Sequence, residues 1–284
     1  MCAHKIAIVT DSSAYIPAEA RKGLNIHVIP LWLIWGNDKY RDEVDIGPAA
    51  FYARLKATKD LPTTSQPSGK EFELFFREVL KTSEAIVCVL VSSQISGTVD
   101  SARMAVAEMP GQDIRIVDTL SCSMGLGFPV LAAARAAKRA DSTQEVAEAA
   151  QAMSRKTHIM FVVDTLEYLH RGGRISGSKH LLGTALNIKP LLHFEEGQIR
   201  PFSQARTKGK ATEALLEAVT ERLGGKRMQE AAVMDVDSME EGNEFAKKVE
   251  ARFSPAVVYR TGVSPVVGTH VGPGTIGIAF YAQD

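Results

Sequence analysis

The amino-acid sequence predicts an α/β protein, and three observations lead to that fold class. Short apolar runs alternate along the 284 residues with longer segments in which apolar side chains recur at helical spacing. Residues 85–91 are apolar without polar alternation, which is typical of a parallel strand covered on both faces. Hydrophobic residues make up 45% of the chain and charged residues 23%, so a collagenous or coiled-coil chain is excluded.

The first half of the chain contains four predicted strands, over residues 5–10, 25–35, 85–91 and 114–118. Helices are expected from about Pro17, over 48–58, over 69–82 and from about Gly97. One face of the helix over 69–82 is expected to be buried, and its members are Phe72, Leu74, Phe75, Val79 and Leu80.

A change of pattern near Thr157 divides the chain. Before it, Ser142 and Glu145 match a capping box and predict a helix to about Lys156. After it, residues 195–197 are expected to turn a hairpin between strands over 188–194 and 198–203. We therefore predict two domains, residues 1–157 and residues 158–284.

The second predicted domain begins with a strand over residues 158–163. It continues after the hairpin with a helix over 208–223 and a second capping box, formed by Ser238 and Glu241. Strands are also expected over residues 230–236, 256–261 and 275–281.

Charge and composition exclude several classes of function. Lys plus Arg and Asp plus Glu both total 33, so no overall basic field attracts nucleic acid or an anionic membrane. No run of 18 apolar residues and no signal-peptide pattern occurs, which predicts a cytoplasmic protein without a membrane span. The three cysteines show no CxxC spacing, so neither a disulfide framework nor a thiolate metal site is expected, and Cys88 is interpreted as a core residue.

Four polar clusters follow predicted strands or precede predicted helices. Helix capping is the simpler explanation of any single cluster, because Ser, Thr and Asp are preferred N-cap residues. Since ligands of open α/β sheets bind beyond the carboxyl ends of strands, the clusters also predict a site where hydroxyls and backbone N–H groups hold a carboxylate or phosphoryl oxygen. The candidate side chains are Asp11, Ser12, Thr64, Ser65, Ser93, Ser96 and Thr119.

Three further candidates lie elsewhere in the chain. His270 belongs to residues 268–274, interpreted as a glycine-rich loop, where an imidazole can donate to an oxyanion or act as a base. Arg174 and Arg206 are candidates for contact with a phosphoryl group or a partner, the alternative being solvated turns. No Walker, GxGxxG, GxSxG or HExxH motif is present, so no nucleotide, cofactor or metal is predicted.

Six motifs, taken together and in this order, resemble the DegV family of fatty-acid-binding proteins. They are residues 9–13 (VTDSS), 64–67 (TSQP), 92–98 (SSxxSGT), 166–176 (LEYLxxGGRIS), 188–190 (IKP) and 270–274 (HVGPG). The family includes the acyl-carrying subunit of bacterial fatty acid kinase. The resemblance covers essentially the whole chain and implies an N-terminal Rossmann-like α/β domain and a C-terminal α/β domain with a mixed sheet.

The resemblance also implies a function and roles for individual residues. A long-chain fatty acid would lie between the two domains, with its carboxylate held by Thr64 and Ser96 and the polar network completed by His270. Arg174 resembles a residue needed when a separate kinase subunit phosphorylates the bound acyl group. The chain would then be a carrier rather than an enzyme.

The physical chemistry of such a carrier is reasonable, and two alternatives stay open. Burying about 15 methylenes at roughly 0.8 kcal/mol each gives about 12 kcal/mol of gross transfer free energy, so apolar burial would dominate affinity. One alternative is a lipid hydrolase or acyltransferase in which His270 activates a pocket serine, with Asp11 or Asp118 behind the imidazole. The other is a regulator whose lipid occupancy a partner senses.

Overall fold

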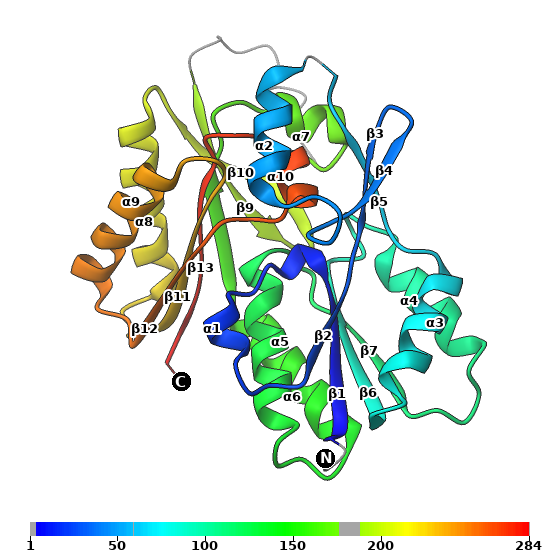
Figure 1. Cartoon of the computed structure of the whole chain (residues 1–284). Helices are drawn as coiled ribbons and strands as arrows, with labels where there is room; N and C mark the ends of the chain where they lie inside the picture. The colour runs from blue at the N-terminus through cyan, green and yellow to red at the C-terminus, as the bar shows by residue number, and fades with distance from the viewer. Residues whose placement is uncertain (1–3, 59, 176–187, 284) are drawn as a thin grey trace.

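The computed structural model describes residues 4–58, 60–175 and 188–283, and it confirms an α/β fold with one parallel and one mixed sheet (Figure 1). The parallel sheet has the order β2-β1-β6-β7. Its strands are β1 (His4–Asp11), β2 (Ile26–Ile29), β6 (Ser83–Leu90) and β7 (Ile114–Asp118).

Helices cover both faces of the parallel sheet, because its strands are apolar on both sides. Ile8 of β1 and Val87 of β6 face α5 (Met124–Ala136) and α6 (Thr143–Lys156). The alternate residues Val9 and Cys88 face α3 (Gly69–Val79) and α4 (Thr98–Ala107). Cys88 is fully buried, which confirms its interpretation as a core residue.

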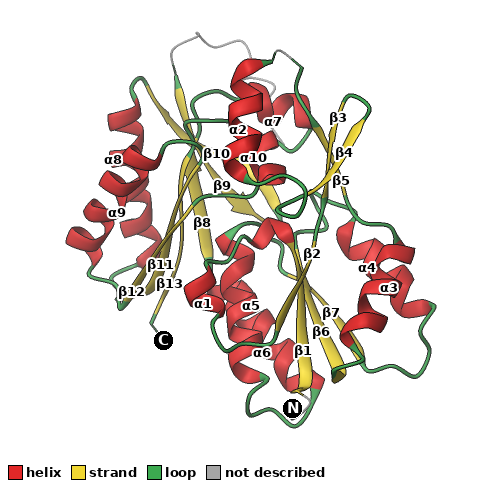
Figure 2. Cartoon of the chain, viewed as in Figure 1, coloured by secondary structure: helices red, strands yellow, loops and turns green. Residues whose placement is uncertain are grey.

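The second sheet is mixed, with six strands in the order β10-β9-β8-β13-β11-β12. Its strands are β8 (His158–Val162), β9 (Lys189–Glu195), β10 (Gln198–Ala205), β11 (Met228–Asp235), β12 (Val257–Thr261) and β13 (Ile276–Ala282). Helices α8 (Lys208–Leu223) and α9 (Met239–Phe253) cover its outer face, and α5 lies between the two large sheets (Figure 2).

A third, smaller layer lies beyond the carboxyl ends of the parallel strands. It contains the antiparallel sheet β4-β3-β5, formed by β3 (Trp32–Trp35), β4 (Asp38–Arg41) and β5 (Thr63–Ser65). Three helices lie beside it, α2 (Pro48–Ala57), α7 (Glu167–Gly172) and α10 (Pro265–Val271). A 3-10 turn (Ser12–Ala14) and the short helix α1 (Ala18–Arg21) follow β1.

The single strand expected over residues 25–35 is wrong, because the chain changes sheet at Pro30. Proline has no backbone N–H to continue a ladder. The chain leaves β2 at Ile29, and β3 starts at Trp32 in the small sheet. Between them the backbone N–H of Leu31 donates to the hydroxyl of Ser12, 3.1 Å away, which holds the bend against the end of β1.

The expected buried face of α3 is wrong at one position. Leu74 is 56% exposed, whereas Phe76 is fully buried. Phe72, Phe76 and Val79 follow the i, i+4, i+7 spacing that keeps side chains on one helix face, and Leu74 lies half a turn away from it. The rings of Phe72 and Phe76 pack with their centroids 5.5 Å apart.

The helix caps differ in part from expectation. The hydroxyl of Ser142 accepts from the backbone N–H of Glu145, as predicted, but the Glu145 carboxylate accepts from Asp141 rather than from Ser142. Ser238 forms no side-chain cap, and its backbone N–H donates to the Asp235 carboxylate, 2.9 Å away. A reciprocal capping box that was not predicted joins Ser68 and Glu71 at the start of α3.

The hairpin between β9 and β10 is confirmed, and a long helix was missed. Glu196 and Gly197 both have positive φ, of 51° and 80°, as a two-residue turn with the twist of a β-hairpin requires. Helix α5 was missed because Gly125, Gly127 and Pro129 suggest a loop. The helix is buried on nearly all sides, so no polar face marks its period.

The two large sheets divide along the chain near the expected boundary. The last strand of the parallel sheet ends at Asp118, and the first strand of the mixed sheet begins at His158. We propose that residues 1–157 and 158–284 are the two domains. Among the described helices, none combines the length and apolar character that crossing a membrane requires.

Candidate functional site

A pocket lies between the carboxyl edge of the parallel sheet and the inner face of the mixed sheet. The first sheet contributes residues that follow its strands, such as Val91 and Cys122. The mixed sheet contributes side chains from the strands themselves, including Ile159 and Phe161 of β8 and Met234 of β11. Most of the lining is apolar, so the body of the pocket suits a hydrocarbon chain.

The pocket has a polar end, formed where β5 meets α10. Thr64 of β5 and His270 of α10 share a hydrogen bond of 2.7 Å between Oγ1 and Nε2. Ser65, Ser96 and Arg174 also line the pocket. The structure therefore brings together five of the side chains that the sequence proposed.

His270 lies in a helix and not in the expected glycine-rich loop. Helix α10 begins after Ser264, whose hydroxyl accepts from the N–H of Val267, and its first residue is Pro265. His270 is in the last turn, and the chain leaves the helix at Gly272 with a φ of 76°. Only the glycines after the helix belong to a loop. The backbone of His270 is helical, and this fixes the direction of its side chain.

Burial keeps His270 uncharged at neutral pH. Desolvation, reinforced by the nearby Arg174 guanidinium, lowers the pKa of His270 from 6.5 to about 4. A neutral imidazole has one donor and one acceptor nitrogen. His270 is therefore able to hold the Thr64 hydroxyl, or an oxygen placed beside it, without adding a positive charge.

Two glycines allow α7 and α10 to approach each other at the polar end. A Cβ on Gly172 would lie 2.2 Å from Nδ1 of His270, and a Cβ on Gly272 would lie 2.3 Å from the ring of Tyr168. Neither distance occurs in real proteins, so a side chain at either position would force the ring of His270 or Tyr168 to move. The GGR and HVGPG motifs thus describe two segments that pack against each other around His270.

Arg174 places a cation at the polar end. Its Nε donates to the carbonyl of Ile95, 3.3 Å away, and its Nη1 donates to the carbonyl of Gly172. Ile95 precedes Ser96, whose hydroxyl lies 2.7 Å from that of Thr98. The polar end therefore combines hydroxyls and a neutral imidazole with one guanidinium, instead of the almost uncharged donor set expected from the clusters.

The structure places the other five candidates outside the pocket lining. Asp11 accepts from the N–H of Val91, Ser12 donates to Asp42, and Thr119 donates to the carbonyl of Leu90. The backbone N–H of Ser93 donates to Asp118, and Arg206 is exposed between β10 and α8. These groups, Arg206 excepted, hold together the loops that follow the parallel strands.

Several pocket residues escaped the sequence analysis. Ser13, Gln66, Ser123 and Thr275 line the pocket, and the first two lay inside clusters already singled out. The apolar pocket residues of β8 could have been found from the alternation of side chains along a strand. Ile159 and Phe161 face the pocket, whereas Met160 and Val162 pack under α8 and α9.

The Thr64–His270 pair lacks the carboxylate that would activate a nucleophile. Nδ1 of His270 is buried, faces Gly172 and has no hydrogen-bond partner in the described parts of the chain. Asp11 bonds to Val91 and Ser13, and Asp118 bonds to the N–H groups of Ser93 and Leu120. Within residues 4–58, 60–175 and 188–283, no group of three or more His, Cys, Asp or Glu side chains could hold a metal ion.

Comparison with known proteins agrees with this architecture over the whole chain. The family model described as "uncharacterised protein, DegV family" matches residues 5–283. A DegV domain-containing protein of Halalkalibacterium halodurans is 36% identical over 281 residues, which are 98% of this chain and 99% of that protein.

Two solved structures are similar in fold and in sequence. A DegV family protein from Thermus thermophilus, described as binding fatty acid, aligns with a TM-score of 0.89 at 32% identity and covers 98% of this chain and 100% of its own. DegV of Bacillus subtilis, described as a fatty acid binding protein, aligns with a TM-score of 0.87 at 34% identity, over 98% and 99% of the two chains. The chain belongs to the DegV family.

Proposed function

We propose that this protein binds a long-chain fatty acid and presents its carboxyl group to a separate kinase. The hydrocarbon chain would lie along Ile159, Phe161 and Met234, and the carboxylate would lie at Thr64, Ser96 and His270. Arg174 lines the same pocket and would face the phosphoryl group. Two structures that resemble this chain over its full length are described as fatty-acid-binding proteins, which supports the ligand class.

The observation that carries the proposal is a polar end on a mostly apolar pocket. The end offers hydroxyl donors, a neutral imidazole and one guanidinium within a single lining. A carboxylate needs a small number of charge-assisted hydrogen bonds, and the apolar walls supply the remaining affinity. A pocket with one polar end and apolar walls suits an amphiphile that has one acidic end.

The phosphorylation step is assigned to a partner protein. A carboxylate oxygen would attack the terminal phosphorus of a nucleoside triphosphate held by the kinase, forming a new P–O bond as the bond to the leaving nucleoside diphosphate breaks. Arg174 would neutralise charge on the arriving phosphoryl group, since a guanidinium matches phosphate geometry. We keep Arg206 as a candidate for partner contact, because it is exposed between β10 and α8.

The hydrolase alternative has weaker support. Nucleophilic catalysis by a hydroxyl requires a base that is itself oriented, usually by a carboxylate. Thr64 and His270 satisfy the first contact, but Nδ1 of His270 faces the backbone of Gly172.

Extraction and mass spectrometry test the ligand directly. The purified protein is denatured, extracted with organic solvent and analysed for aliphatic acids, and a second sample is first incubated with hexadecanoic acid. We expect about one acid per protein chain after incubation. Failure to recover or to load any acid would refute the proposal.

A reconstituted assay tests the carrier role. Lipid-loaded protein is incubated with a candidate kinase and ATP, and hydroxylamine traps the acyl phosphate as a hydroxamate. Arg174→Met should load with hexadecanoic acid and yield much less hydroxamate. Equal yields from the variant and the unmodified protein would remove Arg174 from the phosphoryl-transfer step.

A further inference from the structure

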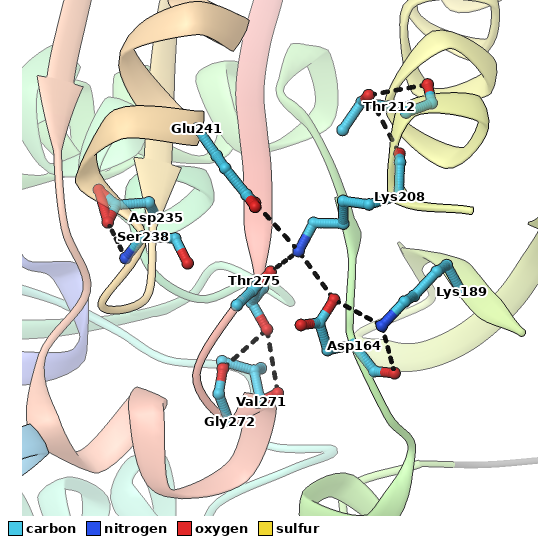
Figure 3. Close-up of polar contacts among 12 residues, drawn as sticks. Asp164, Lys189, Lys208, Thr212, Asp235, Ser238, Glu241, Val271, Gly272 and Thr275 are labelled. Atoms are coloured by element: carbon cyan, nitrogen blue, oxygen red, sulfur yellow. Dashed lines mark hydrogen bonds and ion pairs between the residues drawn. The ribbon is translucent and has the colours of Figure 1, made fainter. Parts of the chain in front are cut away.

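A cluster of charged side chains surrounds Lys208, where segments of the C-terminal half converge (Figure 3). The carboxylate of Asp164, which follows β8, is 2.9 Å from Nζ of Lys208 and 3.0 Å from Nζ of Lys189. Lys208 is the first residue of α8, and it also lies 3.4 Å from Glu241 in the first turn of α9.

Lys208 connects this cluster to the chain that leaves the His270 helix. Its ammonium group donates to the backbone carbonyl of Gly274 as well as to Asp164. The N–H of Gly274 donates to the carbonyl of Val236, 2.9 Å away, so Gly274 is held from two sides. Asp164 also packs against Gly274, since a Cβ on Gly274 would lie 2.3 Å from the Asp164 carboxylate.

Residues 272–275, which these bonds hold in place, directly follow α10. Thr275 follows Gly274, and its hydroxyl donates to the carbonyls of Val271 and Gly272 at 3.0 and 2.9 Å. These carbonyls belong to the last turn and the C-cap of α10, next to His270. A displacement of residues 272–275 therefore shifts the base of the His270 side chain.

Asp164 also precedes the segment on the other side of His270. Helix α7 begins three residues later, at Glu167, and ends at Gly172, against which Nδ1 of His270 packs. The carbonyl of Gly172 accepts from Arg174. Asp164 is thus a junction between the two segments that enclose the imidazole.

We propose that Asp164 and Lys208 are positioning residues that fix His270 against Thr64 for recognition of a ligand carboxylate. Neither residue lines the pocket, so both act through residues 272–275 and through α7. The inference rests on the proposed function for its ligand and on the contacts above for its geometry.

The charges of the two lysines stabilise the ionised Asp164 carboxylate at this contact. Burial alone would raise the pKa of Asp164, but the bonds from Lys208 and Lys189 outweigh burial and hold it below its ordinary value. The side chains of Lys208 and Lys189 are 20% and 27% exposed, whereas that of Asp164 is 41% exposed, so solvent screens part of the attraction within the cluster. Removal of one partner leaves the other charges without their shared contact.

A head-group comparison separates positioning from general stability. Binding of hexadecanoic acid and of hexadecan-1-ol is measured by displacement of a fluorescent fatty acid from the unmodified protein, Asp164→Ala and Lys208→Met. We expect both variants to bind the acid about tenfold more weakly, a change of about 1.4 kcal/mol, and the alcohol almost unchanged. Lys208→Arg should recover most of the loss, because a guanidinium also reaches two oxygen acceptors.

Arg252→Met is the matched control. It removes another ion pair between α8 and α9, in which Arg252 lies 3.0 Å from Glu213, away from residues 272–275. We expect it to bind the acid and the alcohol as the unmodified protein does. Equal losses for the acid and the alcohol in Asp164→Ala or Lys208→Met would overturn the inference.

The imidazole resonances of His270 give a second readout that needs no ligand. We expect Asp164→Ala and Lys208→Met to shift the Nε2 and Nδ1 signals at pH 7, and Arg252→Met to leave them in place. Unchanged signals in the first two variants would overturn the positioning role. A protein that binds neither probe refutes the proposed function, and the His270 signals then decide the positioning role on their own.

Discussion

The hydroxyl of Thr64 and the imidazole of His270 lie 2.7 Å apart, although 206 positions separate them in the chain. One side chain comes from a strand of the small sheet, and the other comes from the last turn of α10. Their contact joins the two proposed domains at the polar end of the pocket.

Removal of the Thr64 hydroxyl should weaken acid binding. A hydrogen bond to a charged group contributes about 1.5–3 kcal/mol, so Thr64→Val should reduce the affinity for hexadecanoic acid about tenfold to a hundredfold. Calorimetric titration measures the change, with Thr64→Ser expected to retain binding. Thr63→Val is the control, because Thr63 is exposed on the same strand. Unaltered affinity in Thr64→Val would exclude Thr64 from head-group recognition.

Acid should weaken the fold through His270. Because the pKa of His270 falls from 6.5 to about 4 on folding, the unfolded chain binds protons more readily between these values. The free energy of unfolding should therefore decrease by roughly 3 kcal/mol from this residue as the pH drops from 6.5 to 4. Urea titrations of the unmodified protein and His270→Gln at several pH values would reveal it. A constant difference between the two proteins across this range would contradict the prediction.

Asp42 should have the opposite effect. Its carboxylate is 1% exposed and accepts from Ser12 and Val266. Burial raises its pKa from 3.8 to about 6 despite these bonds, so the folded state binds the proton more readily between pH 3.8 and 6. The Asp42 contribution to stability should thus increase as the pH falls through 6 and decrease as it rises.

The Asp42 effect appears as a difference between two proteins. Asp42→Asn removes the titration, so the unmodified protein should gain roughly 3 kcal/mol relative to the variant between pH 7 and pH 4. Urea titration at matched pH values measures this gain. Because His270 and Asp42 act in opposite directions, the profile of the unmodified protein alone is expected to be flatter than either difference. A relative loss at low pH would show that the sign is wrong.

A methyl group at Gly172 should displace the imidazole. Its Cβ would overlap Nδ1 of His270, and overpacking of this kind destabilises by about 1–3 kcal/mol. Gly172→Ala should lower the thermal midpoint and shift the His270 resonances. The control is Gly209→Ala, since Gly209 lies in α8 with open space around its Cβ position. The close contact is refuted if both variants behave alike.

One aromatic and one aliphatic residue test which face of α3 is buried. Phe76→Ala should cost about 3–5 kcal/mol, because the ring is fully buried against Phe72. Leu74→Ala should change the free energy of unfolding by less than about 0.5 kcal/mol, because Leu74 is largely exposed. Denaturant titration of the two variants checks the order, and a larger loss at Leu74 would reverse the assignment.

The elements that could be predicted are those in which local pattern and tertiary role agree. The strand at 85–91 is apolar because helices cover both of its faces, and α8 has a clear period from Lys208 to Leu223. Helix α5 could not be predicted, because it is buried on nearly every side and its glycines fit neighbours that only the folded chain supplies. A Cβ on Gly125, for example, would lie 2.1 Å from the Ser121 hydroxyl.

The candidate site could be predicted only as far as its residue types. Thr64, Ser96 and His270 belong to motifs, and the structure brings them to one pocket. Asp11 and Thr119 also belong to polar clusters at the carboxyl ends of strands, but their oxygens bond to backbone groups of neighbouring segments. No local pattern distinguishes a hydroxyl that faces a ligand from one that ties a loop, since the difference arises from contacts distant in the chain.

Residues of both large sheets line the pocket, so a molecule bound there contacts both sheets at once. Its binding energy adds to the resistance of the two sheets against separation, by an amount that grows with the logarithm of ligand concentration. Occupancy of the pocket would therefore stabilise the arrangement of the two sheets against unfolding.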